Sequence, residues 1–105
     1  MRRIKPKQFL DVISDKDLKV CRALLYSRWG YPGRELARRA GINHETCRQS
    51  VMKLEELRIL RIIGYGRTQL ISFNPGNYMA DEILIPTLIK EREYINRMEK
   101  KLNKP

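Results

Sequence analysis

The sequence has few of the residues that build metal, redox or membrane sites. Its 105 residues include two cysteines and one histidine, and no apolar run approaches the roughly 20 residues that cross a bilayer. A single histidine without further ligands at metal spacing argues against a metal site. Cys21 and Cys47 fall on apolar helix faces, which indicates small core residues and not a disulfide framework or a redox sensor.

Catalytic patterns are missing as well. The chain has no Ser/His/Asp or Cys/His set, and no glycine-rich loop stands before a helix where it would hold phosphate. We therefore expect neither an enzyme nor a bound cofactor. Residues 1–7 are basic, but no apolar stretch of a signal peptide follows them, so we expect a cytoplasmic protein.

The chain also lacks internal repeats, low-complexity tracts and Gly/Ser-rich linkers. The strongest turn cluster is Asn-Pro-Gly-Asn at residues 74–77. The sequence thus predicts a domain over residues 1–74 and a C-terminal helical extension over residues 75–105.

Positive charge is what the sequence has in excess, with a formal net charge of +10. Residues 1–67 hold 16 basic and 7 acidic residues, a net charge of +9, whereas residues 68–105 hold 6 and 5, a net charge of +1. This balance favours a polyanionic partner, nucleic acid before a membrane surface, and the partner should face the first two thirds of the chain.

Three helices are predicted in the first half of the chain. Ser14 is a suitable N-cap for the first, with Asp17 three residues later as in a capping box. The second runs from about Arg34 to Ala40 and ends at Gly41, and Asn43 caps the third, over about His44 to Leu57. Cys47, Val51, Leu54 and Leu57 recur on one face of this third helix, which should be buried.

Two short β-rich runs follow, residues 59–63 and 68–73, around a Gly-Tyr-Gly-Arg turn that places Arg67 near its tip. A helix, a short turn with glycine and a second helix form a helix-turn-helix pattern, to which the hairpin would add a wing. The predicted fold is therefore mainly α (α+β), a winged helix-turn-helix with a two-stranded wing at about Gly64 to Thr68 and a C-terminal helix.

The strings GRELARRAGI at residues 33–42, NHET at 43–46 and KLEEL at 53–57 resemble prokaryotic winged helix-turn-helix regulators of the broad MarR and ArsR type. The resemblance covers roughly residues 9–74. Members usually have a glycine after the Leu-Glu-Glu-Leu string, where this chain has Arg58, and a serine or threonine where it has Pro32 and Gly33.

The resemblance implies that the third helix enters the major groove of DNA. It places His44, Glu45, Thr46, Arg48 and Gln49 at base-facing positions, Lys53 toward phosphate and Arg67 on the wing. The chemistry of the side chains agrees, because arginine suits the guanine edge, glutamine the adenine edge and glutamate can accept from cytosine. The predicted phosphate contacts are Arg34, Arg38, Arg39, Lys53 and Arg67, and Asn43 completes the predicted DNA-binding set.

The C-terminal extension carries a heptad-like seam. Its members are Leu84, Leu88, Ile95, Met98 and Leu102, with Glu91 as a misfit, and Pro86 must start or kink the helix. We expect the seam to form a homodimer contact; the alternative is that the helix folds back on the body as an extra core helix.

These features predict a sequence-specific, double-stranded DNA-binding transcriptional regulator. Two alternatives stay open. The same fold can act as a protein–protein interaction module in a transcription or replication assembly, which an exposed apolar patch on the third helix would favour. The same basic face can also bind structured RNA.

Overall fold

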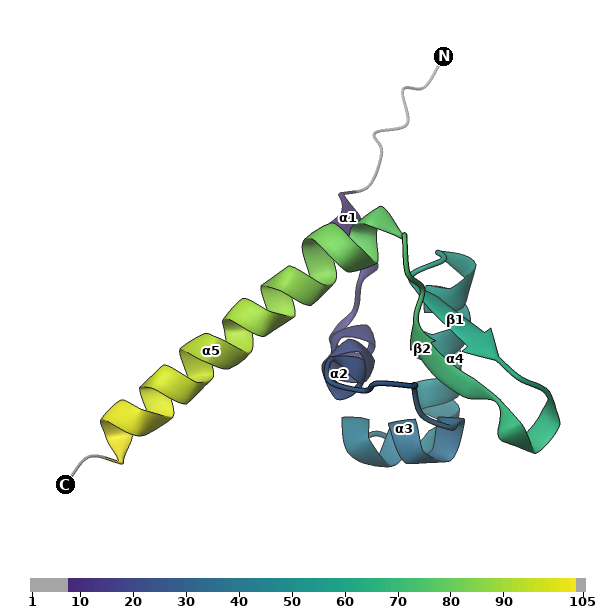
Figure 1. The fold of residues 1–105 in the computed structure, drawn as a ribbon, viewed down its shortest axis with the longest axis horizontal. Helices are drawn as coiled ribbons and strands as arrows, with labels where there is room; N and C mark the ends of the chain where they lie inside the picture. Colours follow the sequence, from purple (N-terminus) through teal and green to yellow (C-terminus); the bar gives the residue numbers. More distant parts are fainter. Residues whose placement is uncertain (1–7, 104–105) are drawn as a thin grey trace, which may run out of the picture.

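The structure, a computed structural model, describes residues 8–103; the basic segment 1–7 lies outside this range. In chain order the elements are α1 (Phe9–Val12), α2 (Asp15–Leu24), α3 (Gly33–Ala40), α4 (His44–Glu56), β1 (Leu60–Ile63), β2 (Leu70–Phe73) and α5 (Ile85–Leu102). The described chain is mainly helical, with a two-stranded antiparallel sheet and a C-terminal helix (Figure 1). The predicted fold class is confirmed at this level.

The helix α2 begins at the predicted cap. Ser14 Oγ accepts a hydrogen bond from the Asp17 N–H at 3.2 Å, and Asp17 Oδ2 accepts one from the Ser14 N–H at 2.9 Å. This reciprocal capping box satisfies two backbone donors that the first turn of a helix leaves without partners. It also places the Asp17 carboxylate in the interior, where its side chain is only 2% exposed.

The turn between α3 and α4 is formed by the residues of the turn itself, Gly41 and Asn43. Gly41 ends α3 with a φ of +72°, a conformation that costs glycine nothing. Asn43 then caps α4, because its Oδ1 accepts a hydrogen bond from the Thr46 N–H at 2.7 Å. Three residues therefore suffice to reverse the chain, and both helix boundaries agree with the prediction.

Arg58, which stands where the resembled regulators usually have glycine, forms the turn that ends α4. Arg58 has a φ of +63°, and its N–H donates to the Glu55 carbonyl at 2.8 Å while the Ile59 N–H donates to the Leu54 carbonyl at 2.9 Å. This is the Schellman arrangement, here closed at some backbone strain. The Asn74 side-chain amide donates to the Arg58 carbonyl at 2.9 Å and holds the strained turn in place.

The hairpin pairs Leu60 with Phe73 and Ile63 with Leu70. Tyr31, between α2 and α3, joins the other edge of β2 through two hydrogen bonds with Ile71, of 3.0 and 2.8 Å. Gly30 makes this approach possible, since a Cβ at that position would lie 2.3 Å from the Ile71 carbonyl oxygen. The helices and the hairpin are thereby tied into one unit.

The core draws on every major element. Its buried apolar members include Val20, Cys21 and Leu24 from α2, Leu36 and Ala37 from α3, Cys47, Val51 and Leu54 from α4, and Leu60 and Ile71 from the strands. Both cysteines are buried as predicted. Leu57, predicted to be buried, is exposed. It is the C-cap residue of α4, so the buried face of the helix ends before it.

The C-terminal helix starts earlier than Pro86. A π-helical segment, Met79–Leu84, runs directly into α5, so Pro86, the second residue of α5, neither begins the helical stretch nor ends it. Ala80, Leu84 and Leu88 belong to the core described above, so the extension shares the core of residues 8–74. The C-terminal half of α5 extends away from the body (Figure 1).

Glu91, the misfit of the predicted seam, has a partner in the chain itself. Its two carboxylate oxygens accept hydrogen bonds of 2.7 and 3.0 Å from Nε and Nη2 of Arg22 on α2. This forked ion pair fixes α5 against α2. No helix within residues 8–103 is long and apolar enough to cross a membrane.

A half-buried ion pair joins α2 to α4. Lys53 Nζ donates to Asp17 Oδ2 at 2.7 Å and to the Val12 carbonyl. Burial by itself raises the pKa of the Asp17 carboxyl, but hydrogen bonds from Lys53, from the Ser14 N–H and from the hydroxyls of Ser50 and Ser14 outweigh it and hold that pKa below its ordinary value. The ionised form of Asp17 therefore stabilises the folded chain.

This pair predicts a specific acid sensitivity. Since folding lowers the Asp17 pKa, its contribution is complete above the ordinary carboxyl value of about 4 and is lost as pH falls through the lower folded-state value. We expect Asp17→Asn to reduce the free energy of unfolding by about 1–3 kcal/mol at neutral pH, and to flatten its decline in acid. Urea unfolding across a pH series measures both effects, with the exposed Glu82→Gln as control. An unchanged acid decline in Asp17→Asn would assign the sensitivity to another carboxylate.

Candidate functional site

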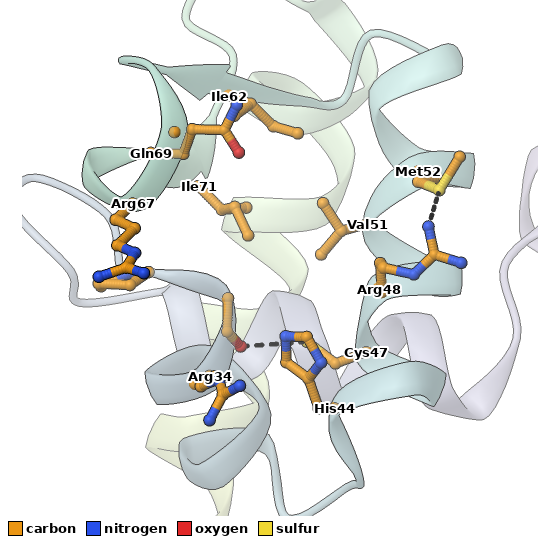
Figure 2. A pocket seen from close by; sticks show the side chains of 13 residues that line it. Arg34, His44, Cys47, Arg48, Val51, Met52, Ile62, Arg67, Gln69 and Ile71 are labelled. Carbon is orange, nitrogen blue, oxygen red and sulfur yellow. Dashed lines mark hydrogen bonds between the residues drawn. The ribbon is translucent and has the colours of Figure 1, made fainter.

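A groove lies between the N-terminal end of α3, the helix α4 and the hairpin (Figure 2). Its volume is about 680 Å³. The residues that line it include Arg34 from α3, His44, Cys47, Arg48, Val51 and Met52 from α4, Ile62 from β1, Ile71 from β2, and Arg67 and Gln69 from the connection between the strands. It brings together segments that are far apart in the sequence.

The floor of the groove is apolar. Cys47 and Val51 point into it from the inward face of α4, and Ile62 and Ile71 reach it from paired positions of the two strands. Burial raises the pKa of the Cys47 thiol, and burial next to Asp17 raises the pKa of Cys21 to about 12. Both thiols stay protonated at neutral pH and make poor nucleophiles.

Arginines from three elements stand around this floor. Arg34 in the first turn of α3 and Arg67 near the hairpin tip are exposed, and neither forms an ion pair with any residue in the described range. Arg48 on α4 is also exposed and lies on the side of the groove opposite Arg67 (Figure 2). Arg34 and Arg67 thus place uncompensated positive charge beside a hollow that α4 and the hairpin share.

Arg48 is held in place by its own helix. Its Nε and Nη2 donate to the two carboxylate oxygens of Glu45 at 3.1 and 3.0 Å, and its Nη1 lies 3.3 Å from the Met52 sulfur. The hydrogen bonds from Arg48 lower the pKa of Glu45, and the same bonds raise the pKa of Arg48. Both groups are therefore charged at neutral pH, and their charges cancel locally.

The other polar residues at the start of α4 divide by role. His44 and Gln49 are exposed, and His44 lies beside Gly33, where a Cβ would come within 3.6 Å of its Nε2. The Asn43 side chain caps α4 by accepting a hydrogen bond from the Thr46 N–H. The Thr46 side chain is half-buried. Of the predicted base-facing residues, His44, Glu45, Arg48 and Gln49 face solvent.

Three residues of the predicted phosphate set point elsewhere. Arg38 and Arg39 both bind Glu35, with Arg39 Nε 2.8 Å from Oε1, and these hydrogen bonds lower the pKa of Glu35. The Arg39 guanidinium also lies 4.4 Å above the Tyr31 ring and does not line the groove. Lys53 is turned inward to Asp17, because its spacing on α4 matches the edge of the buried face.

Sequence reasoning missed the contribution of the strands to this site. Gln69, Ile62 and Ile71 line the groove, whereas the sequence pattern predicts only Arg67 as a contact from the hairpin. The alternation of apolar and polar residues along a paired strand could have indicated them, since every second side chain faces the same side. Their meeting with α4 depends on how the sheet packs.

The predicted dimer residues fall into a buried group and an exposed group. Leu84 and Leu88 are buried in the chain's own core, whereas Ile95, Met98 and Leu102 are 40%, 39% and 79% exposed. Leu25 and Ile95 line a hollow of about 280 Å³ between α2 and α5. Only the outer part of the seam remains free for a partner.

Comparison of the chain with models of protein families, with curated proteins and with solved structures gave no match. The function must therefore be inferred from the site's own residues. Residues 8–103 hold no cluster of three or more side chains able to bind a metal ion. What the groove offers is guanidinium groups, an amide and an imidazole, which bind anions and hydrogen-bonding edges.

Proposed function

We propose that the chain is a winged helix-turn-helix protein that binds double-stranded DNA in a sequence-specific manner and regulates transcription. In this proposal α4 enters the major groove and the connection between β1 and β2 acts as the wing. The observation that carries it is the meeting of Arg34, Arg48 and Arg67, from three elements, around one groove beside the exposed face of α4.

The order of elements supports the proposal. The helices α3 and α4 are joined by three residues with a left-handed Gly41, as in a helix-turn-helix unit, and the hairpin follows directly. In such units the N-terminal residues of the second helix contact the base edges. The exposed acidic residues Glu55 and Glu56 lie at the other end of α4, away from that contact.

The side chains suit the two tasks of DNA binding. Arg34 and Arg67 have no carboxylate partner in the described chain, so they are free to neutralise phosphates. Arg48 and Gln49 carry forked donors and an amide that can read guanine and adenine edges. Arg48 and Glu45 are both exposed, so water screens their attraction and a guanine edge can replace the carboxylate.

A homodimer is part of the same proposal. The outer seam of α5 lies beside the hollow between α2 and α5, which can receive a side chain from the α5 helix of a second copy. Two copies related by a two-fold axis would present two α4 helices to a palindromic site.

One observation favours a second function, binding of a protein partner. Met52 is 54% exposed on α4, beside the apolar floor of Cys47, Val51, Ile62 and Ile71. A groove of this size with an apolar base can accept a side chain of another protein. Arg34 and Arg67, unpaired within the described residues, make nucleic acid the better fit.

Selection of bound sequences from a random duplex pool tests the proposal. We expect an enriched palindrome with two half-sites, which demonstrates base reading and two-fold symmetry together. Recovery of random sequence, or no retention of duplex at low salt, would contradict sequence-specific binding and leave the protein-partner function. An Arg34→Ala/Arg67→Ala variant serves as the negative control, since it lacks the two unpaired arginines of the groove.

A further inference from the structure

A second groove opens where α2, α3 and α5 meet. It has a volume of about 460 Å³ and shares no residue with the groove beside α4. Its charged and aromatic lining residues are Lys19, Arg22, Arg39 and Arg92, together with Tyr26 and Tyr31. Four cations and two aromatic rings therefore line one hollow, and no acidic residue of the described chain is part of its lining.

The groove keeps an excess of positive charge. Glu91 neutralises Arg22, and Glu35 is shared between Arg38 and Arg39. Lys19 and Arg92 form no ion pair with any residue between 8 and 103. Since like charges repel across a small hollow, this arrangement is stabilised by an anion between them.

Two of the guanidinium groups are held ready for a ligand. Arg22 is fixed through Nε and Nη2 by Glu91, which leaves Nη1 to donate. Arg39 is fixed through Nε by Glu35 and stacks over the Tyr31 ring at 4.4 Å, which leaves both terminal nitrogens to donate. Donors already held in one geometry lose little entropy when they bind a phosphate.

The ring of Tyr26 adds a stacking surface. Tyr26 lies in the turn that follows α2 and is 67% exposed at the groove. Planar bases stack on exposed aromatic rings, whatever their sequence. The volume also falls in the range of small-molecule sites, about 300–1,000 Å³.

We propose that this groove binds a nucleotide, with its phosphates on Lys19, Arg22 and Arg92 and its base on Tyr26. Because Arg92 comes from α5 and Lys19 from α2, the bound phosphates would bridge these helices next to the Arg22–Glu91 pair. The site is separate from the proposed DNA contact and does not depend on it.

Isothermal titration of the full chain with ATP, and in parallel with tripolyphosphate, tests the proposal at low ionic strength. We expect ATP to bind more tightly than tripolyphosphate, and Tyr26→Ala to remove the difference. Lys19→Ala with Arg92→Ala should weaken ATP binding by about tenfold or more. The matched control, Lys90→Ala with Arg97→Ala, removes two exposed charges of α5 outside the groove and should change it less than about twofold.

Two results would overturn the proposal. Equal weakening of ATP binding by the Lys19/Arg92 variant and by its control would show a general charge effect and no site. The second result has two parts: the unmodified chain does not bind ATP, and the Lys19/Arg92 variant loses affinity for duplex DNA. The groove would then contact a nucleic-acid backbone and not a free nucleotide. Circular dichroism of each variant shows whether the fold is kept, and neither outcome alters the proposed role of α4.

Discussion

Replacing Arg48 with alanine is expected to lower affinity for the selected duplex by about 5- to 150-fold, and affinity for random duplex much less. A bidentate contact to a guanine edge is worth about 1–3 kcal/mol of discrimination, and only the correct base supplies it. Arg48 is exposed and lies outside the core, so its loss should leave the fold intact. Titration of both duplexes at one fixed salt concentration measures the difference.

Arg67→Ala is the matched comparison, because Arg67 stands across the groove from α4 on the hairpin. A phosphate contact binds every sequence, so this change should weaken both duplexes about equally and reduce the salt dependence by roughly one phosphate per protomer. Equal losses on both duplexes for Arg48→Ala would mean that α4 does not read bases. The protein-partner function, with Met52 at its centre, would then be the better proposal.

Charging the outer seam of α5 is expected to convert a dimer into monomers. Ile95 and Met98 are about two-fifths exposed and continue the face that Leu84 and Leu88 bury against the body. Two glutamates at these positions would place four like charges in a dimer contact, which is strongly unfavourable. Sedimentation velocity of the Ile95→Glu/Met98→Glu variant measures its mass.

Ile89→Glu with Asn96→Glu provides the control, since both residues are exposed and lie on the opposite side of α5 at 100° per residue. This control should remain a dimer. A dimeric seam variant would place the contact elsewhere, and an unmodified chain that sediments as a monomer would remove the homodimer from the proposal.

Much of the local structure could be predicted because its causes lie within a few residues of sequence. The Ser14 box, the Asn43 cap and the left-handed Gly41 each act between positions no more than four apart, so they can be recognised without knowing the fold. The same is true of the departure at Arg58, which takes the strained conformation that the missing glycine implies.

The candidate site was predictable only in part. Exposure of Arg48 and Gln49 follows from the helical period once Cys47 and Val51 are known to face inward. The helical period does not predict that Arg34 and Arg39 line two different grooves. They lie on one short helix, yet one borders the groove with α4 while the other stacks on Tyr31 beside the second groove.

The tertiary structure decided the contacts between distant segments. Lys53 binds Asp17 across 36 positions and Arg22 binds Glu91 across 69, and in both cases a residue that fits a solvent-facing charge in sequence becomes a link between helices. Leu84 and Leu88 likewise meet the core and not a second chain. For α2, α3 and α4 the local sequence indicated the helix boundaries and most of the buried face, because short-range geometry controls these features. Which charges pair, and which apolar residues remain exposed, depended on the packing of α5 and the hairpin, which no local pattern encodes.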